Sequence, residues 1–228
     1  MGKGRDMRII LSGQRSFGAA VLGLLRERGD DVLAVYAPHD GKLATAAGLA
    51  RVPWRLAGTL RHDTMPPEPD LIIAAHSHDF IGRRSRAACR YGAIGYHPSL
   101  LPRHRGRDAV RWTVLMGDPI AGGTVFWLSD TVDGGPIAKQ DWCMARPGDG
   151  PSEIWRRDLF PMGVRLLAEV LQDLDANRVV RVPQDQELAT WEPSFDGAPR
   201  LFRPELAMIG DAGYRVTADP SAAKSAGQ

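Results

Sequence analysis

The chain has 228 residues, 43% of them hydrophobic and 25% charged, which is the composition of an ordinary globular protein with one core. Its net charge of +2 argues against a nucleic-acid partner, and no apolar run approaches the roughly 20 residues of a membrane span. Two cysteines without a Cys-x-x-Cys pair, after a polar start that does not resemble a signal peptide, predict a cytoplasmic protein.

Short apolar runs alternate with amphipathic stretches along the first hundred residues. Strands are expected at 8–12, 31–37, 52–56, 71–75 and 93–97, and helices at 17–28, 43–50 and 82–90. This alternation predicts an α/β fold with a mostly parallel sheet and helices on both faces. Right-handed crossovers would place ligands at the carboxyl ends of the strands, and His97 falls at such an end.

The second half of the chain is less regular. A helix is expected at 107–116, two strands at 123–128 and 137–144 around a turn, and a helix from about Pro151 that Pro161 kinks or restarts. We expect residues 1–195 to form a catalytic domain and residues 196–228 to form a short irregular tail.

Two motifs with rigid turns carry the chemistry. Residues 95–102 read GYHPSLLP and residues 132–136 read VDGGP. Each motif presents one titratable side chain, His97 in the first and Asp133 in the second. A histidine and an aspartate held by such turns are the groups that acid–base chemistry on a carbonyl needs.

HPSLLP followed by DGGP resembles the folate-dependent formyltransferase superfamily, whose catalytic domain has a Rossmann-like formyltransferase fold. The similarity covers roughly residues 7–195, and it is nearest to the hydrolase domain of 10-formyltetrahydrofolate dehydrogenase. The opening residues 10–18 (ILSGQRSFG) and residues 123–127 (GTVFW) share it. The resemblance implies 10-formyltetrahydrofolate as formyl donor or substrate and a small-molecule folate as partner.

The resemblance also implies roles for individual residues. His97 would donate a proton to the formyl oxygen, and Asp133 would accept the proton of attacking water or amine. Gly95 stands where family transferases carry Asn, and the hydrolase domain also lacks that Asn. Gly95 therefore points to hydrolysis and leaves a gap beside His97. The alternative is that Gly95 is present because the backbone needs a positive φ.

The expected folate pocket has two walls, which again follow from the resemblance. The segment from His76 to Ile81 would line the pterin, and the segment from Leu128 to Val132 would offer backbone groups to its hydrogen-bonding edge. The expected contacts are Phe80, Ile81, Leu128, Ser129, Asp130 and Val132.

Other polar residues have plainer interpretations. His76 and His78 could bind a metal, but spacing supplies no third ligand, so no metal is expected. His104 and Arg105 are interpreted mainly as solvated side chains, although they could steady an anionic substrate or the motif loop. Ser99 is expected to brace that loop.

Three functions remain open. The first is hydrolysis of 10-formyltetrahydrofolate to tetrahydrofolate and formate. The second is N-formyl transfer to a small amine, such as a sugar nucleotide or an amino acid derivative. The third is a non-catalytic folate-binding module, which would not need both His97 and Asp133. The resemblance to the hydrolase branch favours the first, and the sequence leaves the oligomeric state open.

Overall fold

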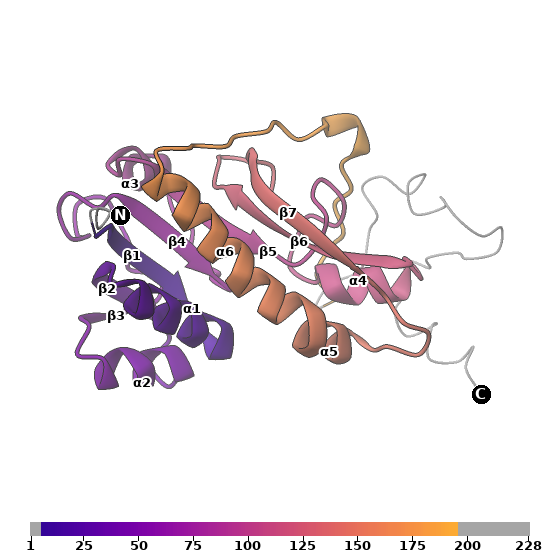
Figure 1. Cartoon of the computed structure of the whole chain (residues 1–228), viewed down its shortest axis with the longest axis horizontal. Helices are drawn as coiled ribbons and strands as arrows, with labels where there is room; N and C mark the ends of the chain where they lie inside the picture. Colours follow the sequence, from indigo (N-terminus) through magenta and orange to yellow (C-terminus); the bar gives the residue numbers. More distant parts are fainter. Residues whose placement is uncertain (1–5, 196–228) are drawn as a thin grey trace.

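The computed structural model describes residues 6–195, in which seven strands form one sheet (Figure 1). The strands are β1 (Arg8–Gly13), β2 (Asp31–Ala37), β3 (Trp54–Leu56), β4 (Leu71–Ala75), β5 (Gly92–His97), β6 (Ile120–Trp127) and β7 (Ile137–Met144). Across the sheet they follow the order β3-β2-β1-β4-β5-β6-β7. Pairs among β1–β5 are parallel, whereas β6 pairs antiparallel with β5 and β7 antiparallel with β6. The predicted mostly parallel sheet is therefore confirmed.

Helices cover the sheet because successive strand residues point to opposite faces. The helices are α1 (Arg15–Arg28), α2 (Lys42–Leu49), α3 (Arg83–Ala87), α4 (Ala109–Leu115), α5 (Pro151–Ile154) and α6 (Phe160–Asp175). On one face α1, α2 and α6 share the larger apolar core with Ile9 and Leu11 of β1 (Figure 1). On the other face Ile10 packs in a smaller cluster with residues that flank α3, including Ile81 and Cys89.

Several expected boundaries differ from the observed ones, and three of them have a clear local cause. The helix expected at 82–90 ends at Ala87, because the amide of Tyr91 already bonds the carbonyl of Asp70 to start β5. β6 begins at Ile120, earlier than expected, because its pairing with β7 extends to Met144. The strand expected at 52–56 is shorter than expected: β3 begins at Trp54 and pairs with β2 over three residues.

The long carboxyl-terminal helix changes type before Pro161. α5 continues into a π-helical turn, Trp155–Leu159, and α6 begins directly after it. The carbonyl of Leu159 accepts a hydrogen bond from the Tyr96 hydroxyl (2.7 Å). The restart expected at Pro161 is thus present as a change of helix type within one helical run.

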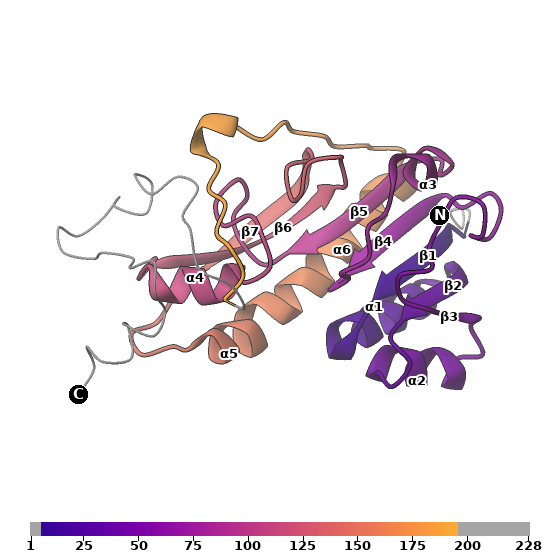
Figure 2. The same ribbon diagram turned by 180° about the vertical axis from the view of Figure 1, so that it is seen from behind.

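The last described segment, residues 176–195, crosses the outside of the sheet and ends beside α4 (Figure 2). Val182 of this segment pairs with Ile137, and the indole of Trp112 in α4 donates to the carbonyl of Pro193 (2.9 Å). The expected tail, residues 196–228, lies outside the described residues. No helix within residues 6–195 is long and apolar enough to cross a membrane.

Candidate active site

His97 lies at the carboxyl end of β5 and is only 7% exposed. Its Nε2 is 2.7 Å from the main-chain carbonyl oxygen of His104. A carbonyl oxygen can only accept, so Nε2 carries a proton. The other ring nitrogen, Nδ1, is 3.6 Å from Oδ2 of Asp133. Nδ1 is therefore the nitrogen that can gain or lose a proton, and it faces a carboxylate.

Asp133 lies in the connection between β6 and β7, with a φ of 49°. Positive φ is uncommon outside glycine, and aspartate is among the residues that tolerate it. Oδ2 of Asp133 accepts a hydrogen bond from the amide of Gly106 (2.8 Å). The structure thus brings together the two motif residues that the sequence places 36 positions apart.

One loop, residues 98–106, holds both of these side chains. It supplies the His104 carbonyl to His97 and the Gly106 amide to Asp133. Within the loop, the Ser99 hydroxyl donates to the carbonyl of Arg103 (2.6 Å), so Ser99 braces the loop as expected. The relative position of the two titratable groups therefore depends on the conformation of this loop.

Arg105 is buried, so the interpretation of its side chain as solvated is wrong. Its Nε and Nη2 donate to Oε1 of Gln184 (3.1 and 2.6 Å), and Nη1 donates to Oε1 of Gln186 (3.0 Å). Burial lowers the pKa of Arg105, and the charge of Asp133 partly opposes that effect. Gln184 links the loop to the β6–β7 connection, since its amide also donates to the main-chain carbonyl of Asp133.

His104 is also buried, at 3% exposed, and it lies between two carboxylates. Its Nε2 is 2.7 Å from Oδ2 of Asp118, and its Nδ1 is 3.1 Å from Oε1 of Glu192. Burial alone would lower the pKa of His104, but the interactions with these carboxylates outweigh it and raise the pKa. Burial in turn favours neutral Asp118, but hydrogen bonds from His104 and Arg103 hold the pKa of Asp118 below its usual range.

Gly95 does not have a positive φ, so the backbone explanation for this glycine is excluded. A Cβ built at Gly95 would lie 3.2 Å from Cδ2 of Leu128 and 3.4 Å from Cε1 of Phe126. The distance to Leu128 is tighter than ordinary van der Waals contact, and the distance to Phe126 is at its lower limit. The gap expected at this position is therefore closed by apolar side chains, and that expectation is wrong.

The six residues expected in the folate pocket have different environments. Ile81 is buried, and Leu128 packs partly buried against the same apolar cluster. Phe80 and Val132, in contrast, are 80% and 56% exposed. The Ser129 hydroxyl donates to the carbonyl of Thr131 (3.0 Å), which keeps it within its own loop. The structure brings Ile81 and Leu128 together and leaves Phe80 and Val132 at the surface.

Asp130, the remaining residue of that group, receives hydrogen bonds from Arg83 and Arg86 of α3. These hydrogen bonds hold the pKa of Asp130 below its usual range. Arg86 also donates from Nη1 to the carbonyl of Ile81 (2.6 Å). Arg86 therefore connects the two segments that were expected to form the walls of the folate pocket.

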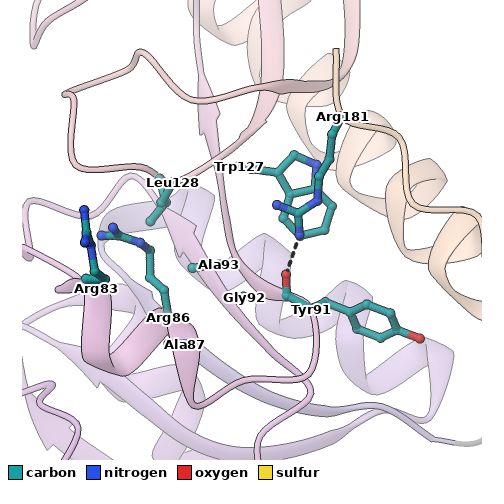
Figure 3. Close-up of a pocket in the computed structure, with 9 residues that line it drawn as sticks. All are labelled: Arg83, Arg86, Ala87, Tyr91, Gly92, Ala93, Trp127, Leu128 and Arg181. Carbon is teal, nitrogen blue, oxygen red and sulfur yellow. Dashed lines mark hydrogen bonds between the residues drawn. The ribbon is translucent and has the colours of Figure 1, made fainter. Parts of the chain in front are cut away.

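A cavity of about 270 Å³ lies beside this arginine pair (Figure 3). Gly92 and Ala93 line it, so it lies at the opposite end of β5 from His97. Arg181 stacks on the ring of Trp127, 3.9 Å from its centroid, and donates from Nη2 to the carbonyl of Tyr91 (2.8 Å). Of the residues expected to contact folate, the cavity touches Leu128 alone.

A basic edge adjoins the site where β1 and β4 end. It consists of Arg15, His76, His78 and Arg107. Burial lowers the pKa of His76 to about 4, with smaller contributions from Arg15 and His78. Burial also lowers the pKa of His78, and the charge of Arg107, just past the loop, adds to that effect. Within residues 6–195, no group of three or more His, Cys, Asp or Glu side chains could hold a metal ion.

Comparisons with known proteins identify the family of this chain. The model of the family described as formyl transferase matches residues 57–171. The mitochondrial 10-formyltetrahydrofolate dehydrogenase of Homo sapiens is 35% identical over 201 residues, which cover 82% of this chain and 22% of that protein. The methionyl-tRNA formyltransferase of Enterococcus faecalis is 28% identical over 205 residues, which cover 82% of this chain and 65% of that protein.

Among solved structures, WlaRD, a sugar 3N-formyltransferase in the presence of dTDP and 5-N-formyl-THF, has a TM-score of 0.71 at 14% identity. The match covers 85% of this chain and 72% of that chain, and at this identity it concerns the fold alone. The chain spans about a fifth of the length of the dehydrogenases that it matches.

Proposed function

This chain belongs to the formyl transferase family, and we propose that it hydrolyses 10-formyltetrahydrofolate to tetrahydrofolate and formate. The observation that carries the proposal is the pair of His97 Nδ1 and Asp133 Oδ2, 3.6 Å apart. That separation is longer than a direct hydrogen bond, so the two atoms do not bond each other and both can still form hydrogen bonds with substrate or water.

Each of these residues moves one proton in the proposed reaction. Asp133 accepts a proton from the water molecule whose oxygen attacks the formyl carbon. His97, as an imidazolium with a proton on each ring nitrogen, donates from Nδ1 to the formyl oxygen as negative charge develops there. The bond between the formyl carbon and N10 then breaks as N10 takes the proton held by Asp133, and a hydroxyl group of the intermediate returns a proton to His97. Formic acid, which ionises to formate, leaves with the oxygen that came from water.

The choice of water over an amine rests on Gly95 and on the dehydrogenase relatives. Gly95 supplies no side-chain amide at the position where family transferases have Asn. Dehydrogenases stand among the relatives of this chain at 33–36% identity. We propose that residues 1–195 form the catalytic domain and that the protein works in the cytoplasm. The folate would lie between the Ile81 and Leu128 segments.

The decisive experiment is incubation with 10-formyltetrahydrofolate alone, with tetrahydrofolate and formate measured over time. We expect both products in equal amounts without any added amine. His97→Gln serves as the control for the spontaneous background. A wild-type rate equal to that of His97→Gln would overturn the proposal.

Formyl transfer to a small amine is the second candidate, and the basic edge favours it. Arg15 and Arg107 would attract an acceptor with an anionic group, such as a sugar nucleotide, to the side where β1 and β4 end. The relative from Enterococcus faecalis is a formyltransferase by name. A formylated amine that forms faster than free formate, when an amino sugar nucleotide is added, would select this function.

A further inference from the structure

We propose that His104 is a positioning residue, which the buried carboxylates of Asp118 and Glu192 hold so that its carbonyl fixes the ring of His97. The inference builds on the proposed function, because it names what keeps the proposed acid in its working form. One arm of its test is independent of activity.

The first step is the burial of the cluster. His104 is 3% exposed and Glu192 is 2% exposed, although both side chains are polar and can carry a charge. Buried carboxylates are tolerated when they are paired with cations. His104 and Arg103 supply these cations, and Arg103 donates to both oxygens of Asp118 (2.9 and 2.8 Å). Two carboxylates and two cations therefore balance within the cluster.

The second step is that stability alone does not account for this arrangement. Nδ1 of His104 lies 3.1 Å from Oε1 of Glu192, but the angle between the two groups is not that of a hydrogen bond. Oε2 of Glu192 has no hydrogen-bond partner among residues 6–195. A buried polar atom without a partner costs free energy, and apolar residues of similar size often serve stability equally well. The cluster is better explained by the geometry that it imposes.

The third step is the transmission of this geometry to His97. The backbone of His104 has a φ of 58°, a conformation that a side chain disfavours. Its amide donates to Oγ1 of Thr190 (2.7 Å), and its carbonyl accepts from Nε2 of His97 (2.7 Å). The ring contacts and these two bonds together fix the peptide. The imidazole between its carboxylates thereby determines where the carbonyl points.

The consequence concerns the tautomer of His97. With the carbonyl in place, the neutral ring carries its proton on Nε2, and Nδ1 is the nitrogen that exchanges protons. If the carbonyl turned away, the proton could reside on Nδ1 and hydrogen-bond Asp133. The proposed acid and base would then engage each other instead of the substrate.

The test uses Glu192→Gln, which keeps the shape of the side chain and removes its charge, and Glu187→Gln as a matched control on the exposed surface of the same segment. Nitrogen NMR of histidine-labelled protein reports the protonated nitrogen of each ring, and His97→Gln assigns the signal. We expect His97 protonated at Nε2 in the wild type and in Glu187→Gln, and a mixture of tautomers in Glu192→Gln.

The kinetic arm measures kcat and KM for the same three proteins. We expect kcat of Glu192→Gln to fall about tenfold, which is part of the effect of an acid–base group, while KM changes by less than about twofold. An unchanged His97 signal in Glu192→Gln would overturn the inference, even if the melting temperature fell. If the wild type proves inactive, the proposed function fails, and the NMR result still decides the positioning role.

Discussion

The amide of Gln184 donates to the main-chain carbonyl of Asp133 at 2.8 Å. The same nitrogen donates to the carbonyl of Gly135 (2.6 Å), and Oε1 of Gln184 accepts from Arg105. One buried side chain thus joins the loop that holds His97 to the turn that carries Asp133. The geometry of the two titratable groups depends on a residue that contacts neither of their side chains.

This relationship leads to a prediction for Gln184→Ala. The substitution leaves two carbonyls and a buried guanidinium without their partner, which should cost about 1–3 kcal/mol of unfolding free energy. Urea denaturation measures this loss. Gln186→Ala is the matched control, because exposed Gln186 gives Arg105 a single acceptor. Equal free energies of unfolding for the two variants would show that Gln184 stabilises the fold no more than Gln186 does.

Removal of either titratable group should abolish most turnover. We expect His97→Gln and Asp133→Asn each to lower kcat by about 10²–10⁴, because each moves a proton in one transition state. The double variant should be little slower than the slower single variant. Binding of a stable folate analogue, measured by calorimetry, should survive in all three. A single variant with near-wild-type turnover would remove that residue from the mechanism.

Gly95→Asn should destabilise the protein without raising its rate. The new side chain meets Leu128 and Phe126, and overpacking of this kind costs about 1–3 kcal/mol. A second substitution, Leu128→Ala, should restore part of the lost stability of Gly95→Asn by making space. Thermal melts of the two single variants and the double variant measure this coupling. A stable and faster Gly95→Asn would contradict the closed space that we describe.

His76 should contribute to the pH dependence of stability. Its pKa is about 4 in the folded chain, against an ordinary value of 6.5. Between these values the unfolded chain takes up a proton that the folded chain does not. The free energy of unfolding therefore falls as the pH drops from 6.5 toward 4.

The variant that checks this prediction is His76→Asn, since asparagine tolerates the positive φ of 58° at this position. Urea midpoints across the same pH interval should decline less steeply for the variant than for the wild type. Parallel profiles for the two proteins would assign the decline to other groups, and His39→Asn, at an exposed position, is the control.

Local sequence patterns were sufficient for the strands of the sheet, whereas the joint role of the two motifs was expected from the family resemblance. The apolar runs that became β1, β2 and β4 were found within one residue of their observed bounds, because burial on both faces leaves an uninterrupted apolar signal. The turns around His97 and Asp133 carry Pro and Gly, which have strong local preferences.

The residues that hold the two titratable side chains in place could not be predicted from local sequence patterns. Arginine is mostly exposed in proteins and histidine is intermediate, so burial of Arg105 and His104 is not expected from their residue types. Arg105 and Gln184 are 79 positions apart, and no spacing rule connects them. The closed space at Gly95 likewise depends on Leu128 and Phe126, which come from another strand and the loop after it. Such contacts exist only once the sheet has formed.

The crossing of residues 176–195 over the sheet has a consequence for synthesis of the chain. Gln184, Thr190 and Glu192 contact the loop of residues 98–106. All three come after every strand of the sheet in the sequence. All strands of the sheet are therefore synthesised before the residues that complete the site. Under the proposed function, the site would be complete only after the ribosome has released Glu192, almost the last of the described residues.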